Sequence, residues 1–110
     1  MTSIRVGLFP SVARPSGDQT LPAILDQAAA DGIDHLCVGD HVSFFVGAGS
    51  DGLITATSLL AVQAELPVYV ALYLLPLRHP LPVARQLATI AQIALEHLSG
   101  PTPGMFCLQP

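Results

Sequence analysis

Two short polar runs follow apolar segments of the sequence and carry residue types that can do chemistry. Asp40 and His41 come directly after one apolar segment, and Arg78 and His79 follow another, residues 68–75. An imidazole can donate or accept a proton near neutral pH, and a guanidinium can make charge-assisted hydrogen bonds to an anion. The sequence therefore predicts a functional site that contains Asp40, His41 and Arg78.

The spacing of apolar residues predicts the elements that position these side chains. We expect strands over residues 4–9, 33–38 and 68–75, and helices over residues 21–31, 52–65 and 81–98. Right-handed crossovers make such a sheet parallel. The carboxyl ends of parallel strands lie at one edge of the sheet, where ligands bind in α/β proteins. The two polar runs are thus expected at the same edge.

Composition excludes several classes of function. The chain is 51% hydrophobic and 11% charged, with a mean hydropathy of +0.57, which is typical of parallel strands buried on both faces. No segment reaches the roughly 18 apolar residues that span a bilayer, and the first ten residues do not read as a signal peptide. The net charge is −4 and there is no lysine. We therefore expect a cytoplasmic protein that binds neither nucleic acid nor a membrane.

Metal and disulfide chemistry are not expected. Cys37 and Cys107 are the only cysteines, and neither belongs to a C-x-x-C pair. The four histidines show no spacing that is typical of metal ligands. We interpret His35, inside the second strand, as a structural residue.

A glycine-rich run offers an alternative function. Residues 47–52 match G-x-G-x-x-G, and Arg78 follows at a distance that suits a 2′-phosphate partner. However, the apolar run 42–46 begins too soon after the preceding strand to form a separate parallel strand. We favour a glycine-rich loop at the site, with a small dinucleotide-binding module as the alternative.

The βα pattern ends after the third helix. Pro101 and Pro103 cannot lie inside a strand, and residues 101–110 are expected to be irregular. Three parallel strands alone leave two unpaired edges and one layer of helices. The chain therefore reads as a truncated part of a larger α/β domain.

Three segments, residues 32–41, 74–80 and 84–89, resemble the luciferase-like monooxygenase family, the bacterial luciferase superfamily of flavin- or deazaflavin-dependent oxidoreductases. The resemblance covers residues 1–100 and about the first third of a family member, whereas residues 101–110 depart from it. It implies the first three βα units of a truncated TIM (β/α)8 barrel.

The resemblance also implies a cofactor and a site. Family members bind flavin mononucleotide (FMN) or a deazaflavin coenzyme at the carboxyl mouth of the barrel and act on a small-molecule substrate. It places the catalytic residues His41 and Asp40 beside the reacting ring, with Asp40 holding His41. A bulge with a non-prolyl cis peptide is implied near Ala71 and Leu72, which together with Arg78 form the expected cofactor site. Family members are often homodimers.

We expect an N-terminal fragment of a flavin- or deazaflavin-dependent oxidoreductase or monooxygenase that is inactive alone. Besides the small dinucleotide-binding module, the alternative is a non-enzymatic half-barrel that associates with a partner chain.

Overall fold

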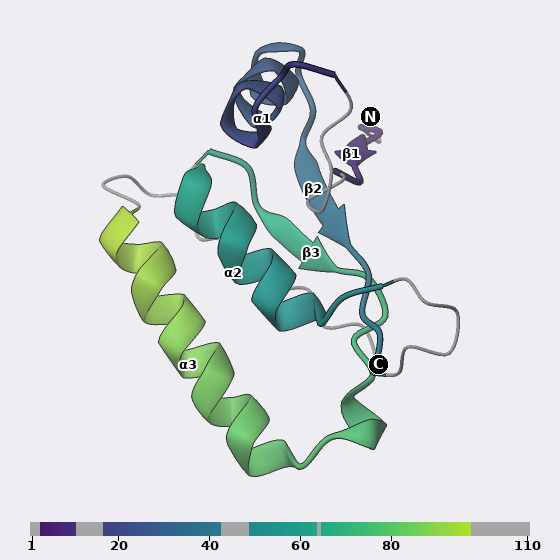
Figure 1. The fold of residues 1–110 in the computed structure, drawn as a ribbon, viewed down its shortest axis with the longest axis vertical. Helices are drawn as coiled ribbons and strands as arrows, with labels where there is room; N and C mark the ends of the chain where they lie inside the picture. Colours follow the sequence, from purple (N-terminus) through teal and green to yellow (C-terminus); the bar gives the residue numbers. More distant parts are fainter. Residues whose placement is uncertain (1–2, 11–16, 43–48, 64, 98–110) are drawn as a thin grey trace.

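Three strands alternate with three helices along the chain (Figure 1). The computed structural model describes residues 3–10, 17–42, 49–63 and 65–97. The elements are β1 (Gly7–Leu8), α1 (Leu21–Ala30), β2 (His35–Val38), α2 (Gly52–Val62), β3 (Val68–Val70), the 3-10 helix η1 (Leu75–Leu77) and α3 (Pro80–His97). The predicted alternation of strands and helices is confirmed. The expectations for residues 101–110 lie outside the described residues.

The strands form one parallel sheet in the order β1-β2-β3. Gly7 is in register with His35, and Leu36 is in register with Val68. Each strand is followed by a helix, so a crossover connection returns the chain to the same end of the sheet every time. The parallel sheet that the sequence predicts is therefore confirmed over these three strands.

The third strand is shorter than the sequence predicts. It was expected over residues 68–75, but β3 ends at Val70, and its last ladder bond runs from the N–H of Ala71 to the carbonyl of Val38 at 2.7 Å. Leu72 then adopts a positive φ of 60°, which turns the chain out of the strand direction. The apolar run that follows forms a loop and η1, because its neighbour β2 has already ended.

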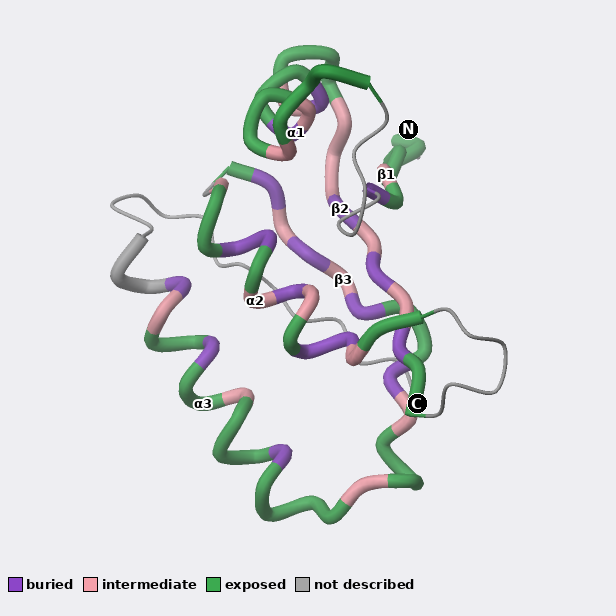
Figure 2. Tube along the Cα trace, in the orientation of Figure 1, coloured by how far each residue is buried: buried purple, intermediate pink, exposed green. Residues whose placement is uncertain are grey.

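The core lies between one face of the sheet and the helices (Figure 2). The alternate strand residues facing it are almost completely buried: Leu36, Val38, Val68 and Val70. Helix α2 packs on β2 and β3, and α3 packs on α2. On the other face His35, Cys37 and Tyr69 are half-buried, with the ring of His35 edge-on to that of Tyr69 at 4.9 Å.

In the part of the chain that the structure describes, no helix combines the length and the apolar character needed to cross a membrane.

Candidate functional site

Asp40 and Arg78 meet at the carboxyl edge of the sheet. Asp40 follows the end of β2, and Arg78 follows η1. Nη1 of Arg78 donates to Oδ2 of Asp40 at 2.6 Å, and Nη2 donates to Oδ1 at 2.8 Å. The Asp40 side chain is fully buried, and the Arg78 side chain is 13% exposed. The sequence placed both residues at one edge, and the structure joins them in a bidentate ion pair.

Two backbone amides complete the surroundings of the Asp40 carboxylate. The N–H of Gly52 donates to Oδ1 and the N–H of Leu74 donates to Oδ2, each at 2.8 Å. Burial alone would raise the pKa of Asp40. The hydrogen bonds from Arg78, Leu74 and Gly52 outweigh that effect, so the pKa lies below its ordinary value. Asp40 is therefore a charged, fully satisfied group.

Arg78 uses all four of its Nη hydrogens inside the chain. Besides Asp40, Nη2 donates to Oδ2 of Asp51 at 3.0 Å, and Nη1 donates to the carbonyl of Leu74 at 3.2 Å. The guanidinium also lies over the ring of Tyr73, 4.3 Å from its centroid. The hydrogen bond to Asp40 is the main reason that the pKa of Arg78 is raised. The guanidinium thus has no Nη donor left for the phosphate of a cofactor.

The first turn of α2 is likewise capped by carboxylates of the chain itself. Gly52 donates to Asp40, while the amides of Leu53 and Ile54 donate to Oδ1 of Asp51 at 3.0 and 3.1 Å. A helix N-terminus binds phosphate through such amides when they are not otherwise engaged. Here they have partners, so this helix does not offer the phosphate cradle of a dinucleotide site.

The last glycine of the G-x-G-x-x-G run has a packing reason. A Cβ on Gly52 would lie 2.6 Å from Cγ1 of Val70 and 3.1 Å from the carbonyl of Gly39. The glycine lets α2 begin directly against the sheet. Gly47 and Ala48 lie outside the described residues. Packing therefore explains the glycine at position 52 without a bound dinucleotide.

His41 is exposed, and Asp40 does not hold it. Among the hydrogen bonds of the described residues, none joins the side chains of Asp40 and His41. Both carboxylate oxygens of Asp40 accept from Arg78 and from backbone amides instead. The expectation that Asp40 holds His41 is therefore wrong. The backbone N–H of His41 donates to the carbonyl of Ser50 at 3.0 Å. Gly49, with φ 119°, lies so close that a Cβ there would be 2.5 Å from Cγ of His41.

Phe9 is a site residue that the sequence analysis missed. It directly follows β1 and is 65% exposed. A Cβ on Gly39 would lie 3.4 Å from Cζ of Phe9 and 3.8 Å from Cε1 of His41, so both rings flank Gly39. The strand was expected over residues 4–9, so Phe9 was its last residue, and β1 in fact ends at Leu8. The available signal was therefore its place at a strand end, near which the two polar runs also lie.

Ala71 and Leu72 lie at the same edge, just past β3. Both are exposed, Leu72 at 69%. The described residues contain no cis peptide bond, so the expected cis bulge is wrong. The backbone turns instead through the positive φ of Leu72. The strand ends therefore present Phe9, His41 and Leu72, which we call the strand-edge shelf.

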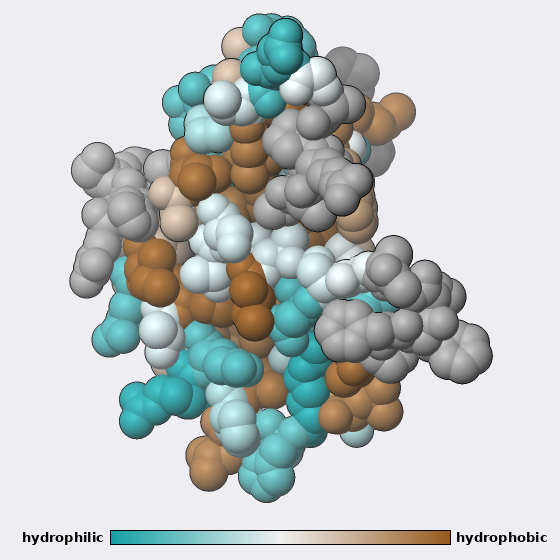
Figure 3. All heavy atoms as spheres, viewed as in Figure 1, coloured by the Kyte–Doolittle hydropathy of each residue, from teal (hydrophilic) through white to brown (hydrophobic). Residues whose placement is uncertain are grey.

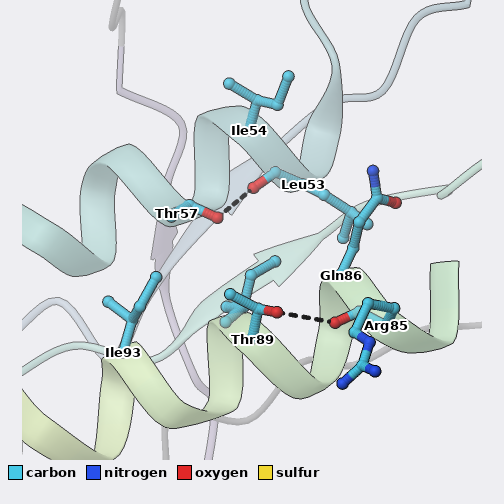
Figure 4. Close-up of a pocket in the computed structure, with 8 residues that line it drawn as sticks. Leu53, Ile54, Thr57, Arg85, Gln86, Thr89 and Ile93 are labelled. Atoms are coloured by element: carbon cyan, nitrogen blue, oxygen red, sulfur yellow. Dashed lines mark hydrogen bonds between the residues drawn. The ribbon is translucent and has the colours of Figure 1, made fainter. Parts of the chain in front are cut away.

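A groove of about 230 Å³ lies elsewhere, between α2 and α3 (Figure 4). Leu53, Ile90 and Ile93 contribute to its apolar lining. The hydroxyl of Thr57, which also lines it, donates to the carbonyl of Leu53. Apolar side chains also reach the surface here, as Figure 3 shows, and Ile54 is 69% exposed. The groove belongs to the helix layer and contains no residue of the strand-edge shelf.

Comparison with known proteins identifies a likeness of fold. No family model and no characterised protein sequence matches the chain. Among solved structures, it is similar to a type II Baeyer-Villiger monooxygenase, the oxygenating constituent of 3,6-diketocamphane monooxygenase from the CAM plasmid of Pseudomonas putida, in complex with FMN. The TM-score is 0.59 at 18% sequence identity, over 92% of this chain and 31% of that one. The chain thus shares the fold of about a third of a longer protein.

Proposed function

We propose that the chain is the N-terminal part of an FMN-dependent oxidoreductase of the luciferase-like monooxygenase type. The observation that carries the proposal is the fold likeness, over 92% of the chain, to a monooxygenase in complex with FMN. The segments 32–41 and 74–80, on which the sequence resemblance depends, contain the Asp40–Arg78 pair and His41. The sequence resemblance therefore points to the carboxyl edge of β2 and β3 as the place of the site.

The residue types of the strand-edge shelf suit the ring of a flavin. An isoalloxazine ring is flat, and ligand pockets combine apolar walls with a few polar groups. Phe9 and Leu72 are 65% and 69% exposed, and the imidazole of His41 lies close to Phe9 across Gly39. When bound, the flavin would supply the redox chemistry. His41 would orient or protonate a small-molecule substrate next to the ring.

Arg78 and the first turn of α2 do not offer a site for the phosphate of FMN. The Nη groups of Arg78 and the first amides of α2 are already bonded to Asp40, Asp51 and Leu74. In TIM barrels the phosphate is frequently held by the loops after the seventh and eighth strands. We therefore propose that the chain holds only the ring and is inactive or nearly so alone.

Titration of FMN and of riboflavin against the chain, followed by quenching of flavin fluorescence, tests this proposal. We expect weak, saturable binding of both, with affinities within about threefold of each other, because the phosphate adds no contact. The same titration with a deazaflavin analogue compares the two cofactors that the sequence leaves open.

A matched pair of variants shows where the flavin binds. Leu72 and Ile54 are both 69% exposed, one on the strand-edge shelf and the other on α2. Leu72→Asp should weaken riboflavin binding at least tenfold. Aspartate tolerates the positive φ at this position better than most residues do. Ile54→Asp should leave riboflavin binding unchanged. No saturable quenching, or equal losses in both variants, would contradict the proposal.

A second candidate is a half-barrel that associates with a partner chain. On the face of the sheet opposite the core, His35, Cys37 and Tyr69 are half-buried, whereas the alternate residues on the other face are buried. Parallel sheets usually have both faces covered. This observation favours association, and a homodimer is the simplest form of it.

A further inference from the structure

We infer that Arg78 is a positioning residue, which keeps His41 and Leu72 at a fixed separation through Asp40. The inference rests on the proposed function, in which these two residues face a flavin ring. It gives Arg78 a role other than binding a phosphate, and it assigns a role to each partner of the buried ion pair.

The segment that carries His41 is connected to Arg78. Asp40 is its neighbour in the chain, and the carboxylate is held by Arg78 at 2.6 and 2.8 Å. His41 itself bonds to Ser50, and Arg78 bonds to Asp51 at 3.0 Å. Both ends of the connection between β2 and α2 are therefore fixed to the same guanidinium.

The segment that carries Leu72 is connected to the same ion pair. Two residues after Leu72, the N–H of Leu74 donates to Asp40 and the carbonyl of Leu74 accepts from Nη1 of Arg78. Tyr73, between Leu72 and Leu74 in the sequence, stacks its ring against the guanidinium. The backbone on the carboxyl side of Leu72 is therefore held by both members of the ion pair.

Geometry favours a positioning role over a contribution to overall stability. The fork of arginine matches two carboxylate oxygens in one plane, which lysine cannot do. Replacing both members of a buried ion pair with apolar residues often leaves stability unchanged, although removing one member alone is costly because the other charge stays buried without a partner. A lysine in place of Arg78 would keep the charge and remove only the fork. This pair bridges the strand ends rather than the core, which is formed by apolar residues such as Leu36 and Val70.

Hydrogen exchange of backbone amides, measured by NMR on the full chain, tests the inference without a ligand. In Arg78→Lys we expect exchange at Gly52 and Leu74 to be roughly ten- to a hundredfold faster, because the acceptor that holds both amides is no longer fixed. The amide signals of His41 and Leu72 should shift. Exchange at Leu36, in the β2–β3 ladder, should stay within about threefold of the wild type.

Two further variants control the experiment. Arg85→Lys makes the same change at an exposed position on α3 and should alter none of these amides. Asp51→Asn keeps an N-cap residue but weakens one contact of Arg78, and should accelerate exchange at Leu74 by a smaller factor in the same direction.

The outcomes separate a local role from a global one. Unchanged exchange at Gly52 and Leu74 in both Arg78→Lys and Asp51→Asn would overturn the inference. So would equal acceleration at Leu36, or loss of the folded state in Arg78→Lys, since either result means that the pair holds the whole fold.

Riboflavin binding supplies the readout for function. Arg78→Lys should weaken it about tenfold if wild type binds. If the wild-type chain binds no flavin at all, the proposed function fails, and the exchange rates still decide whether Arg78 fixes His41 and Leu72.

Discussion

Asp40 carries a charge in a place without access to water, and its carboxylate accepts from four donors. Asp40→Asn removes that charge and turns one acceptor into a donor, so Arg78 loses its main partner. Breaking one side of a buried ion pair costs about 3 kcal/mol or more. We expect that loss in the free energy of unfolding from urea denaturation. Asp26→Asn, exposed on α1, should change it by less than about 0.5 kcal/mol. Equal effects would contradict the assignment.

The lowered pKa of Asp40 also predicts how stability depends on pH. An unfolded aspartate titrates near pH 3.9, as model peptides do, and the folded pKa lies lower. The contribution of Asp40 is therefore complete above the unfolded pKa and is lost as the pH falls through the folded pKa. We expect the free energy of unfolding of wild type to approach that of Asp40→Asn as the pH falls below about 4. A difference between the two that does not shrink would show that Asp40 is not ionised.

From the sequence, it was easier to predict which residues lie together at the site than which groups each of them contacts. Parallel βα units bring residues that follow strand ends to one edge, so Asp40, His41 and Arg78 were foreseeable as neighbours. The hydrogen-bond partner of each side chain was not foreseeable. The local backbone geometry decides where the side chain of Asp40 points, and its being next to His41 in the sequence does not bring the two side chains together. Phe9 was not foreseeable from its residue type, because a phenyl ring carries no acid, base or charge.

Among the elements, α2 depends most on a single small residue. Gly52 begins the helix against β3, and a Cβ there would lie 2.6 Å from the buried Val70. Gly52→Ala should destabilise the chain by about 1–3 kcal/mol, because the sheet or the helix must shift. Gly39→Ala is the control, since its Cβ would make only ordinary contacts. Thermal unfolding followed by circular dichroism measures both. A Gly52→Ala variant as stable as wild type would contradict the close packing of α2 on β3.

Element types were predictable and strand ends were not. Apolar periodicity identifies helices such as α3 whatever their neighbours, because the pattern itself defines the buried face. A strand continues only as far as its neighbour offers hydrogen bonds. β3 stops at Val70, since β2 ends at Val38 and the carbonyl of Val38 accepts the last ladder bond, from the N–H of Ala71. Residues 71–75 were predicted as strand because they are apolar. Residues of a loop can be apolar as well, so this property does not separate the two.

At the scale of the whole molecule, the two faces of the sheet differ in how far they are buried. On one face His35, Cys37 and Tyr69 are half-buried, while the alternate residues on the other face are buried by the helices. Parallel sheets usually have both faces covered. Sedimentation velocity should therefore show association that increases over the micromolar range. A cation at Tyr69, on the outer strand β3, would be buried without a partner in any assembly that covers this face. We expect Tyr69→Lys to weaken association at least tenfold, and Ser58→Lys, exposed on α2, to change it little. If the wild-type chain is monomeric at every concentration, or if the two variants behave alike, this face of the sheet is not where the chain associates.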